Sequence, residues 1–240
     1  RRRAPADRVE LEVERNVKEL DAILPHAPEV DRAFYRGVWY DQEMQHGRIL
    51  DRLKAELGLP PAEPLTEVGG PIKALAVAAH LKPIQDVVRA VYYFTGASTE
   101  RQAVLAYSAL IERLEDMGED AVAQTVVQPI KRQEPGHFAF YSLSATKIVP
   151  ELKPWQLWLA RQLRARSYEL VGTHHDPRYQ AQMGGVSEVL GFAADPRDYA
   201  REIGRLEARV LWANRHGMEF PPYVLEAIEE SRRLYATGRG

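Results

Sequence analysis

Apolar residues recur at helical spacing along almost the whole chain, and this period constrains the fold more than any other feature. The first stretch, residues 7–24, places five of them on one helical face before Pro25: Val9, Val13, Val17, Leu20 and Leu24. The alternation of apolar and polar residues that is typical of strands is scarce. We therefore expect an all-α protein.

Proline and glycine divide this pattern into separate helices. The expected helices cover residues 7–24, 28–57, 72–94, 98–117, 120–147, 155–171, 197–215 and 221–236. Pro83 and Pro135 should bend the helices that contain them, because proline lacks a backbone donor. Ser98-Thr99 indicates a helix start, and Leu57 is expected on the buried face that also holds Trp39, Leu50 and Leu53. The Gly- and Pro-rich stretch before residue 197 is expected to be a loop.

Composition excludes several classes of protein. The chain of 240 residues has 32 Lys+Arg against 34 Asp+Glu, so apart from Arg1-Arg2-Arg3 it lacks the basic excess of a nucleic-acid binder. It has no cysteine, so any metal must bind carboxylates and imidazoles. No apolar run approaches the roughly 18–20 residues of a membrane span, and no signal peptide is visible. We expect a cytoplasmic protein.

Two Glu-x-x-His motifs are the strongest candidates for a functional site: Glu43 with His46, and Glu134 with His137. Residues three apart on a helix share a face, so both side chains of a motif can reach one metal ion. Both motifs also lie on apolar stripes, where a charged residue costs several kcal/mol unless it is paired or binds a cation. The alternative is two surface helices with solvated polar residues.

The helix before each motif supplies a further glutamate, Glu10 or Glu100. Glu43 follows Glu10 by 33 residues (43 − 10), and Glu134 follows Glu100 by 34 (134 − 100). Antiparallel helices joined by a short loop bring residues that are equidistant from the loop to one level. Glu14 is an alternative to Glu10 on the first helix. Glu100 could instead be an acidic residue in a helix's first turn.

The resulting order, Glu…Glu-x-x-His twice, matches the ligand pattern of ferritin-like dimetal carboxylate bundles. Four carboxylates and two imidazoles suit two iron ions, or one manganese and one iron, and balance the charge of two divalent ions. We therefore expect a ferritin-like four-helix bundle over residues 1–150. Residues 151–240 would form additional C-terminal helices packed on the bundle.

Within this superfamily the chain most resembles the soluble acyl-carrier-protein desaturases, over residues 7–150. The similar segments are Trp39-Tyr40-Asp41-Gln42-Glu43-Met44-Gln45-His46-Gly47 with Leu50 and Leu53, Tyr93-Phe94-Thr95 to Glu100-Arg101, and Gln133-Glu134-Pro135-Gly136-His137 with Tyr141. Ala103 stands where that family usually carries threonine.

The resemblance implies that Glu43 and Glu134 bridge two metal ions, that Glu10 and Glu100 are terminal ligands, and that His46 and His137 bind one ion each. It also implies O2 as co-substrate, a ferredoxin-like electron donor and an apolar, fatty-acyl or acyl-carrier-bound substrate. Desaturation and hydroxylation are the expected reactions. The aromatic residues expected to line the pocket are Trp39, Tyr107, Phe138 and Tyr141.

Other functions remain compatible with the same residues. On the same fold the reaction could be N-oxygenation or oxidative cleavage of a C–C bond. A non-enzymatic alternative is an iron-handling protein or a helical scaffold with a decayed site. We expect a homodimer. In the last third, Arg161, Arg164 and Arg166 are expected on a solvated helix face, or else to dock an acidic carrier protein or electron donor.

Overall fold

The computed structural model describes residues 6–238, and within this range it contains helices and no strand. The expectation of an all-α protein is confirmed. None of the described helices is both long and apolar enough to cross a membrane. Arg1-Arg2-Arg3 lies outside the described residues. The helical elements are α1 (Ala6–Leu11), α2 (Val13–Ile23), α3 (Glu29–Ala33), η1 (Phe34–Trp39), α4 (Tyr40–Glu56), α5 (Gly70–Ala78), α6 (Lys82–Asp116), α7 (Asp120–Val122), η2 (Ala123–Val127), α8 (Gln128–Lys131), α9 (Glu134–Ile148), η3 (Val149–Glu151), α10 (Pro154–Ser167), α11 (Pro177–Leu190), α12 (Pro196–Arg209) and α13 (Pro222–Thr237).

The chain divides into two compact units, with the boundary inside α6. The N-terminal unit ends at Arg89, and the C-terminal unit begins at Ala90. Within the C-terminal unit, Leu105 of α6 packs against the same apolar core as residues after 150, among them Tyr168 and Ile228. The expected division into a bundle over residues 1–150 and an extension over residues 151–240 stays a prediction.

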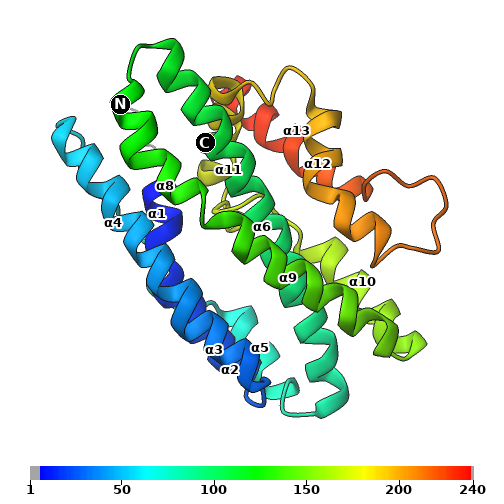
Figure 1. The fold of residues 1–240 in the computed structure, drawn as a ribbon. Helices are drawn as coiled ribbons and strands as arrows, with labels where there is room; N and C mark the ends of the chain where they lie inside the picture. Colours follow the sequence, from blue (N-terminus) through cyan, green and yellow to red (C-terminus); the bar gives the residue numbers. More distant parts are fainter. Residues whose placement is uncertain (1–5, 239–240) are drawn as a thin grey trace. The chain divides into compact units, whose positions relative to one another are not determined.

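An antiparallel helical hairpin makes up most of the N-terminal unit. Its first arm is α1 and α2, its second arm is α3, η1 and α4, and α1 lies along α4 (Figure 1). Near the turn, Asp21 of the first arm accepts hydrogen bonds from Tyr35 (3.0 Å) and Arg36 (2.6 Å) of the second. The two arms therefore pair in the order expected from the sequence.

The helix expected over residues 7–24 is interrupted at Glu12. The Glu12 side chain is 2% exposed and accepts hydrogen bonds from Arg8 Nη1 (2.5 Å) and from the backbone N–H of Leu65 (3.3 Å). A buried carboxylate needs such partners. The break between α1 and α2 therefore lies at a residue with tertiary contacts. The spacing of apolar residues in the sequence does not reveal these contacts.

The expectation that Leu57 is buried is wrong, since it is 67% exposed. Residues Phe34–Trp39 form the π-helix η1. A π-helix bonds i to i+5 and so holds more residues per turn than an α-helix. At the end of η1, Trp39 is buried as expected, and its neighbour Val38 is 53% exposed. Leu57 lies just beyond the end of α4.

Helix α6 of 35 residues shows that the expected helix start at Ser98-Thr99 is wrong. Serine and threonine favour helix starts because their hydroxyls cap free N–H groups. Ser98 instead lies inside α6, with its hydroxyl 3.5 Å from that of Tyr168. Glu100 is consequently in the interior of a long helix and not in a first turn. The bend expected at Pro83 is a full break, because the chain turns at residues 79–81 and α6 begins at Lys82.

The C-terminal unit contains a second antiparallel hairpin, formed by α6 and the α7–α9 segment. Gly118, with a φ of +79°, turns the chain between the arms, and glycine adopts this backbone conformation without strain. The second arm includes the π-helix η2 and is interrupted at residues 132–133. Helix α9 then begins at Glu134 with Pro135 next to it. The distortion expected at Pro135 is therefore confirmed.

The stretch before residue 197 is not a loop throughout, because α11 occupies much of it. Asp176 caps this helix by accepting a hydrogen bond from the N–H of Arg178 (2.8 Å), and Gly191 ends it with a φ of +86°. The glycines inside α11 do not break it but let it approach α13 closely. A Cβ on Gly184 would lie 2.2 Å from the backbone oxygen of Ser231.

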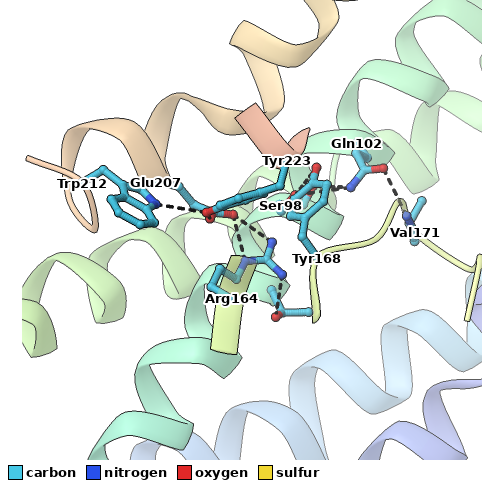
Figure 2. A network of polar contacts seen from close by, with 9 residues as sticks. Ser98, Gln102, Arg164, Tyr168, Val171, Glu207, Trp212 and Tyr223 are labelled. Carbon is cyan, nitrogen blue, oxygen red and sulfur yellow. Dashed lines mark hydrogen bonds and ion pairs between the residues drawn. The ribbon is translucent and has the colours of Figure 1, made fainter. Parts of the chain in front are cut away.

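A buried polar network joins the C-terminal helices to α6 (Figure 2). Arg164 of α10 is 2% exposed and donates to Glu207 of α12 through Nε (2.9 Å) and Nη2 (2.8 Å). It also donates to Thr95 of α6 (3.2 Å). The expectation that Arg164 lies on a solvated or docking face is wrong, because its charge is paired inside the protein.

Two further contacts extend the network along α6. The hydroxyl of Tyr168 lies 3.5 Å from that of Ser98, and Gln102 accepts a hydrogen bond from the N–H of Val171 (3.2 Å). Thr95, Ser98 and Gln102 follow one another at about one helical turn, so they form one face of α6. The segment that follows α10 contacts this face of α6 through Tyr168 and Val171.

The close approach of α11 and α13 predicts a marked effect of Gly184→Ala. The added methyl group meets backbone atoms of Ser231, so the two helices must separate at a cost of about 1–3 kcal/mol. Urea unfolding monitored by circular dichroism measures this loss. Gly37→Ala is the control, because a Cβ there meets nothing within 4 Å. Equal stability of the two variants would contradict the prediction.

Candidate metal centre

Three of the predicted ligands come together in the N-terminal unit. Glu10 lies on α1, and Glu43 and His46 lie on α4. One potential ligand atom of each residue lies within 4.8 Å of those of the other two. Glu43 and His46 are 5% and 1% exposed, and Glu10 is partly buried. These three residues are called the N-terminal triad below.

Gly47 explains how Glu10 reaches the motif on α4. A Cβ at Gly47 would lie 2.7 Å from Cγ and 3.1 Å from the backbone nitrogen of Leu11. Only a glycine lets α1 approach α4 this closely. Because Leu11 directly follows Glu10 and Gly47 directly follows His46, this contact places the Glu10 carboxylate beside the motif.

The C-terminal unit brings together the same three residue types. Glu100 lies on α6, and Glu134 and His137 lie on α9. Their potential ligand atoms also lie within 4.8 Å of one another. The three side chains, called the C-terminal triad below, are 2%, 0% and 1% exposed.

Gly96 and Tyr141 set the distance between the two helices of this triad. Gly96 is one turn before Glu100, and Tyr141 is one turn after His137. A Cβ on Gly96 would lie 2.4 Å from Cε1 of the Tyr141 ring. The Tyr141 hydroxyl also accepts a hydrogen bond from that of Tyr92 (3.3 Å). The ring is therefore fixed in the space that the missing side chain leaves.

The distances within the triads suit shared binding of a cation. His137 Nδ1 lies 3.4 Å from Oε2 of Glu100 and 3.4 Å from Oε2 of Glu134. His46 Nδ1 lies 3.6 Å from Oε2 of Glu43. A direct N–H···O hydrogen bond spans about 2.7–3.2 Å. Two ligand atoms that each lie about 2.1 Å from the same ion are about 3 Å apart when the ligand–ion–ligand angle is 90°.

Electrostatics also favour a cation in each triad. Glu100 and Glu134 place two carboxylates within 4.8 Å of each other in a buried setting. Two like charges about 4 Å apart repel by roughly 4 kcal/mol at an effective dielectric constant near 20. A divalent ion replaces this repulsion with attraction. The oxygen and imidazole donors fit a divalent transition metal such as iron or manganese.

The structure separates Glu14 from the triads. Glu14 lies on α2, its side chain is 59% exposed, and it accepts a hydrogen bond from Lys18 (2.9 Å). Glu10, and not Glu14, therefore lies beside the motif on α4. An exposed i,i+4 pair of this kind contributes only a few tenths of a kcal/mol.

The residues predicted to line a pocket have different settings. Tyr107 of α6 and Tyr141 of α9 are 4% and 1% exposed, and Phe138 of α9 is partly buried. Trp39 of the N-terminal unit is 9% exposed and lies one turn before Glu43. Tyr141 fills the space against Gly96. Its position supports a role in shaping the centre, and the pocket itself stays a prediction.

Sequence reasoning missed the residues that bring the helices together. Gly47 and Gly96 lie inside helical patterns, where a glycine signals a close backbone approach. The two glycines were visible in the sequence, but a glycine does not show which residue packs against it. The residue is Leu11 at Gly47 and Tyr141 at Gly96. The π-helices that precede α4 and α9 leave no mark in the apolar period.

Comparison of the chain with models of known protein families, with curated proteins and with solved structures finds no significant match in any of the three. The arguments for a function therefore rest on the side chains of the two triads and on their surroundings.

The contact between Gly96 and Tyr141 predicts strong coupling between the two positions. Gly96→Ala forces the ring away and should cost about 1–3 kcal/mol, and Tyr141→Ala leaves a cavity that costs about 3–5 kcal/mol. In the double variant the new methyl group enters that cavity, so the loss should be smaller than the sum by about 1–3 kcal/mol. Urea unfolding of the four proteins measures the coupling, and strict additivity would refute the contact.

Proposed function

We propose that this protein binds two divalent transition-metal ions, one for each triad, and uses them with O2 to oxidise a C–H bond of an apolar, fatty-acyl substrate. The observation that carries the proposal is the duplication of one donor set, two glutamates and a histidine, on two helical hairpins, with every member buried except Glu10, which is partly buried. A single polar cluster can arise from packing. Two clusters with the same composition and order call for a common chemical cause.

A ferritin-like bundle consists of four helices, the number that two helical hairpins provide. We propose this architecture for the chain, with Glu10, Glu43 and His46 as ligands from one hairpin and Glu100, Glu134 and His137 from the other. Two carboxylates in each triad balance the charge of one divalent ion. Two iron ions, or one manganese and one iron, fit these donors, whereas zinc favours a smaller tetrahedral set.

Such ions, when bound, supply the redox capacity that O2 activation requires. The chain's own residues hold the donors in place and keep water out. Gly47 and Gly96 allow the helix approaches on which each triad depends, and Tyr141 closes the space beside His137. Exclusion of water favours productive oxidation because it suppresses side reactions of activated oxygen.

The aromatic residues near the triads support an apolar substrate. Tyr107 and Tyr141 are buried on the helices of the C-terminal triad, and Trp39 precedes the motif on α4. None of these side chains carries a charge that would recognise an ionic group. An acyl chain delivered by a carrier protein, with electrons from a ferredoxin-like donor, fits this setting. Desaturation or hydroxylation is the proposed reaction.

Metal content is the first test of the proposal. Protein expressed with iron and manganese available should contain about two of these ions per chain by elemental analysis. Because Glu43 and Glu134 are proposed to bridge the ions, Glu43→Ala and Glu134→Ala should each lose both. Glu14→Ala is the matched control and should retain them. Loss of a single ion would show independent triads, and full retention in both variants would refute the proposal.

Metal removal should lower stability, because an ion that binds the folded chain alone stabilises it. At a metal concentration a hundredfold above Kd the gain is about 2.7 kcal/mol. Chelation should therefore lower the melting temperature of the parent protein and leave Glu134→Ala unchanged. A scaffold with a decayed site predicts the opposite: removing Glu134 would relieve charge repulsion and leave the protein as stable or more stable.

Oxygen uptake tests the reaction itself. The iron-loaded, chemically reduced protein should consume O2 faster when a long-chain acyl thioester on a carrier protein is added, and mass spectrometry should find a desaturated or hydroxylated chain. Glu134→Ala should abolish the stimulation. Metal binding without any oxidised acyl product would restrict the protein to iron handling, or to another substrate such as an amine.

A further inference from the structure

We propose that Trp212 and Tyr223 form a redox-active pair that carries oxidising equivalents from the vicinity of α6 to the protein surface, with Glu207 as proton acceptor. The use of this pair in the cell rests on the proposed function, because the metal centre would be the source of the oxidising equivalents. The exchange between the two side chains does not depend on the metals.

The hydrogen bonds within the pair are the basis of the proposal (Figure 2). Trp212 Nε1 donates to the Tyr223 hydroxyl over 3.1 Å, and that hydroxyl donates to Glu207. Tyrosine and tryptophan lose an electron far more readily when a proton can leave at the same time. Both side chains have an acceptor for that proton, Glu207 for Tyr223 and the Tyr223 oxygen for Trp212.

Glu207 is held ready to accept the proton. It is 1% exposed, and Arg164 fixes its other oxygen at 2.8 Å and 2.9 Å. Burial and, next, the Glu207 carboxylate raise the pKa of Tyr223 well above its ordinary value. The phenol is therefore protonated in the resting protein. Its proton can move only along the existing hydrogen bond to Glu207.

Tyr168 connects the pair to α6. The ring centroids of Tyr168 and Tyr223 are 5.2 Å apart, and the Tyr168 hydroxyl is 3.5 Å from that of Ser98. Ser98 precedes Glu100 by two residues, a rise of about 3 Å along the helix. The Arg164 guanidinium lies 4.6 Å from the Tyr168 ring and disfavours positive charge there. Tyr168 thus lies between Tyr223 and Ser98 of α6, on the route that we propose for the electron.

The steps balance. An oxidant near α6 takes one electron from Tyr223, whose proton passes to Glu207 and leaves a neutral phenoxyl radical. Trp212 then transfers a hydrogen atom: its Nε1–H bond breaks, the Tyr223 O–H bond forms, and a neutral indolyl radical remains. A thiol or ascorbate-type reductant in solution restores the Trp212 N–H by giving up a hydrogen atom. Glu207 releases to solvent the proton that it took from Tyr223, so that over the cycle one electron passes to the oxidant and one proton to water.

Trp212 lies where such a reductant can reach it. Its side chain is partly buried, and the residues that follow it, Asn214 and Arg215, are exposed. The Arg161 guanidinium lies 5.1 Å from the indole ring and donates to Asn214 (2.7 Å), which fixes the ring in place. The Trp212 indole, at the end of the proposed pathway that lies nearer to the solvent, is therefore held in a fixed position.

Flash photo-oxidation of metal-free, full-length protein tests the exchange directly. Trp155 and Trp158 are 45% and 61% exposed and would react first, so both are replaced by phenylalanine in every protein compared. A ruthenium polypyridyl photo-oxidant then generates the indolyl radical at Trp212. We expect its absorbance to decay to a mixture of indolyl and tyrosyl radicals, because outward transfer requires that both be populated. The decay should be slower in D2O because a hydrogen atom moves.

Three variants test which side chains give rise to the indolyl absorbance and to its decay. Tyr223→Phe keeps the ring but removes the hydroxyl, so the indolyl radical should persist at least tenfold longer. Tyr179→Phe, which changes a partly buried tyrosine on α11, is the matched control and should behave like the parent. Trp212→Phe should abolish the early indolyl signal.

Identical decay in the parent and in Tyr223→Phe, with both proteins folded by circular dichroism, would overturn the proposal. Because the protein contains no metal in this experiment, that result would leave the proposed metal centre untouched. Conversely, a chain that binds no metal could still show the radical exchange.

Discussion

The rest of the structure depends on one electrostatic constraint: carboxylates are gathered in the interior of helical hairpins. Glu100 and Glu134 are at most 2% exposed and lie beside the imidazole of His137. Such a cluster is unfavourable unless positive charge accompanies it. Gly47 and Gly96 let the helices that carry these residues approach closely, and a divalent ion is the positive charge that we propose for each triad.

In both units a glycine lets two helices approach closely, but the residue that packs against the glycine differs. In one, Gly47 accommodates the backbone and side chain of Leu11; in the other, Gly96 accommodates the ring of Tyr141. In both, a π-helical segment precedes the helix that carries the motif. π-Helical segments are rare and frequent at functional sites. Their occurrence before both motifs supports a shared role.

The last third of the chain has a structural task that links it to α6. Arg164 and Glu207 form a buried ion pair, and Tyr168 and Val171 contact the same face of α6 through Ser98 and Gln102. Removing one partner of such a pair leaves a buried charge and costs about 3–5 kcal/mol. The pair therefore binds the C-terminal helices to the helix that carries Glu100. Tyr223 and Trp212, which are hydrogen-bonded beside this ion pair, are the residues that we propose to exchange a hydrogen atom.

The sequence by itself determined the helical class, most helix positions and the six candidate ligands, because helical period and the i,i+3 spacing are local properties. Tertiary structure decided the remainder. Whether Ser98 caps a helix or contacts Tyr168, and whether Arg164 is solvated or paired with Glu207, depend on residues far away in the chain. Local spacing specifies which side chains share a face, whereas burial and partners are fixed only when another helix packs against that face.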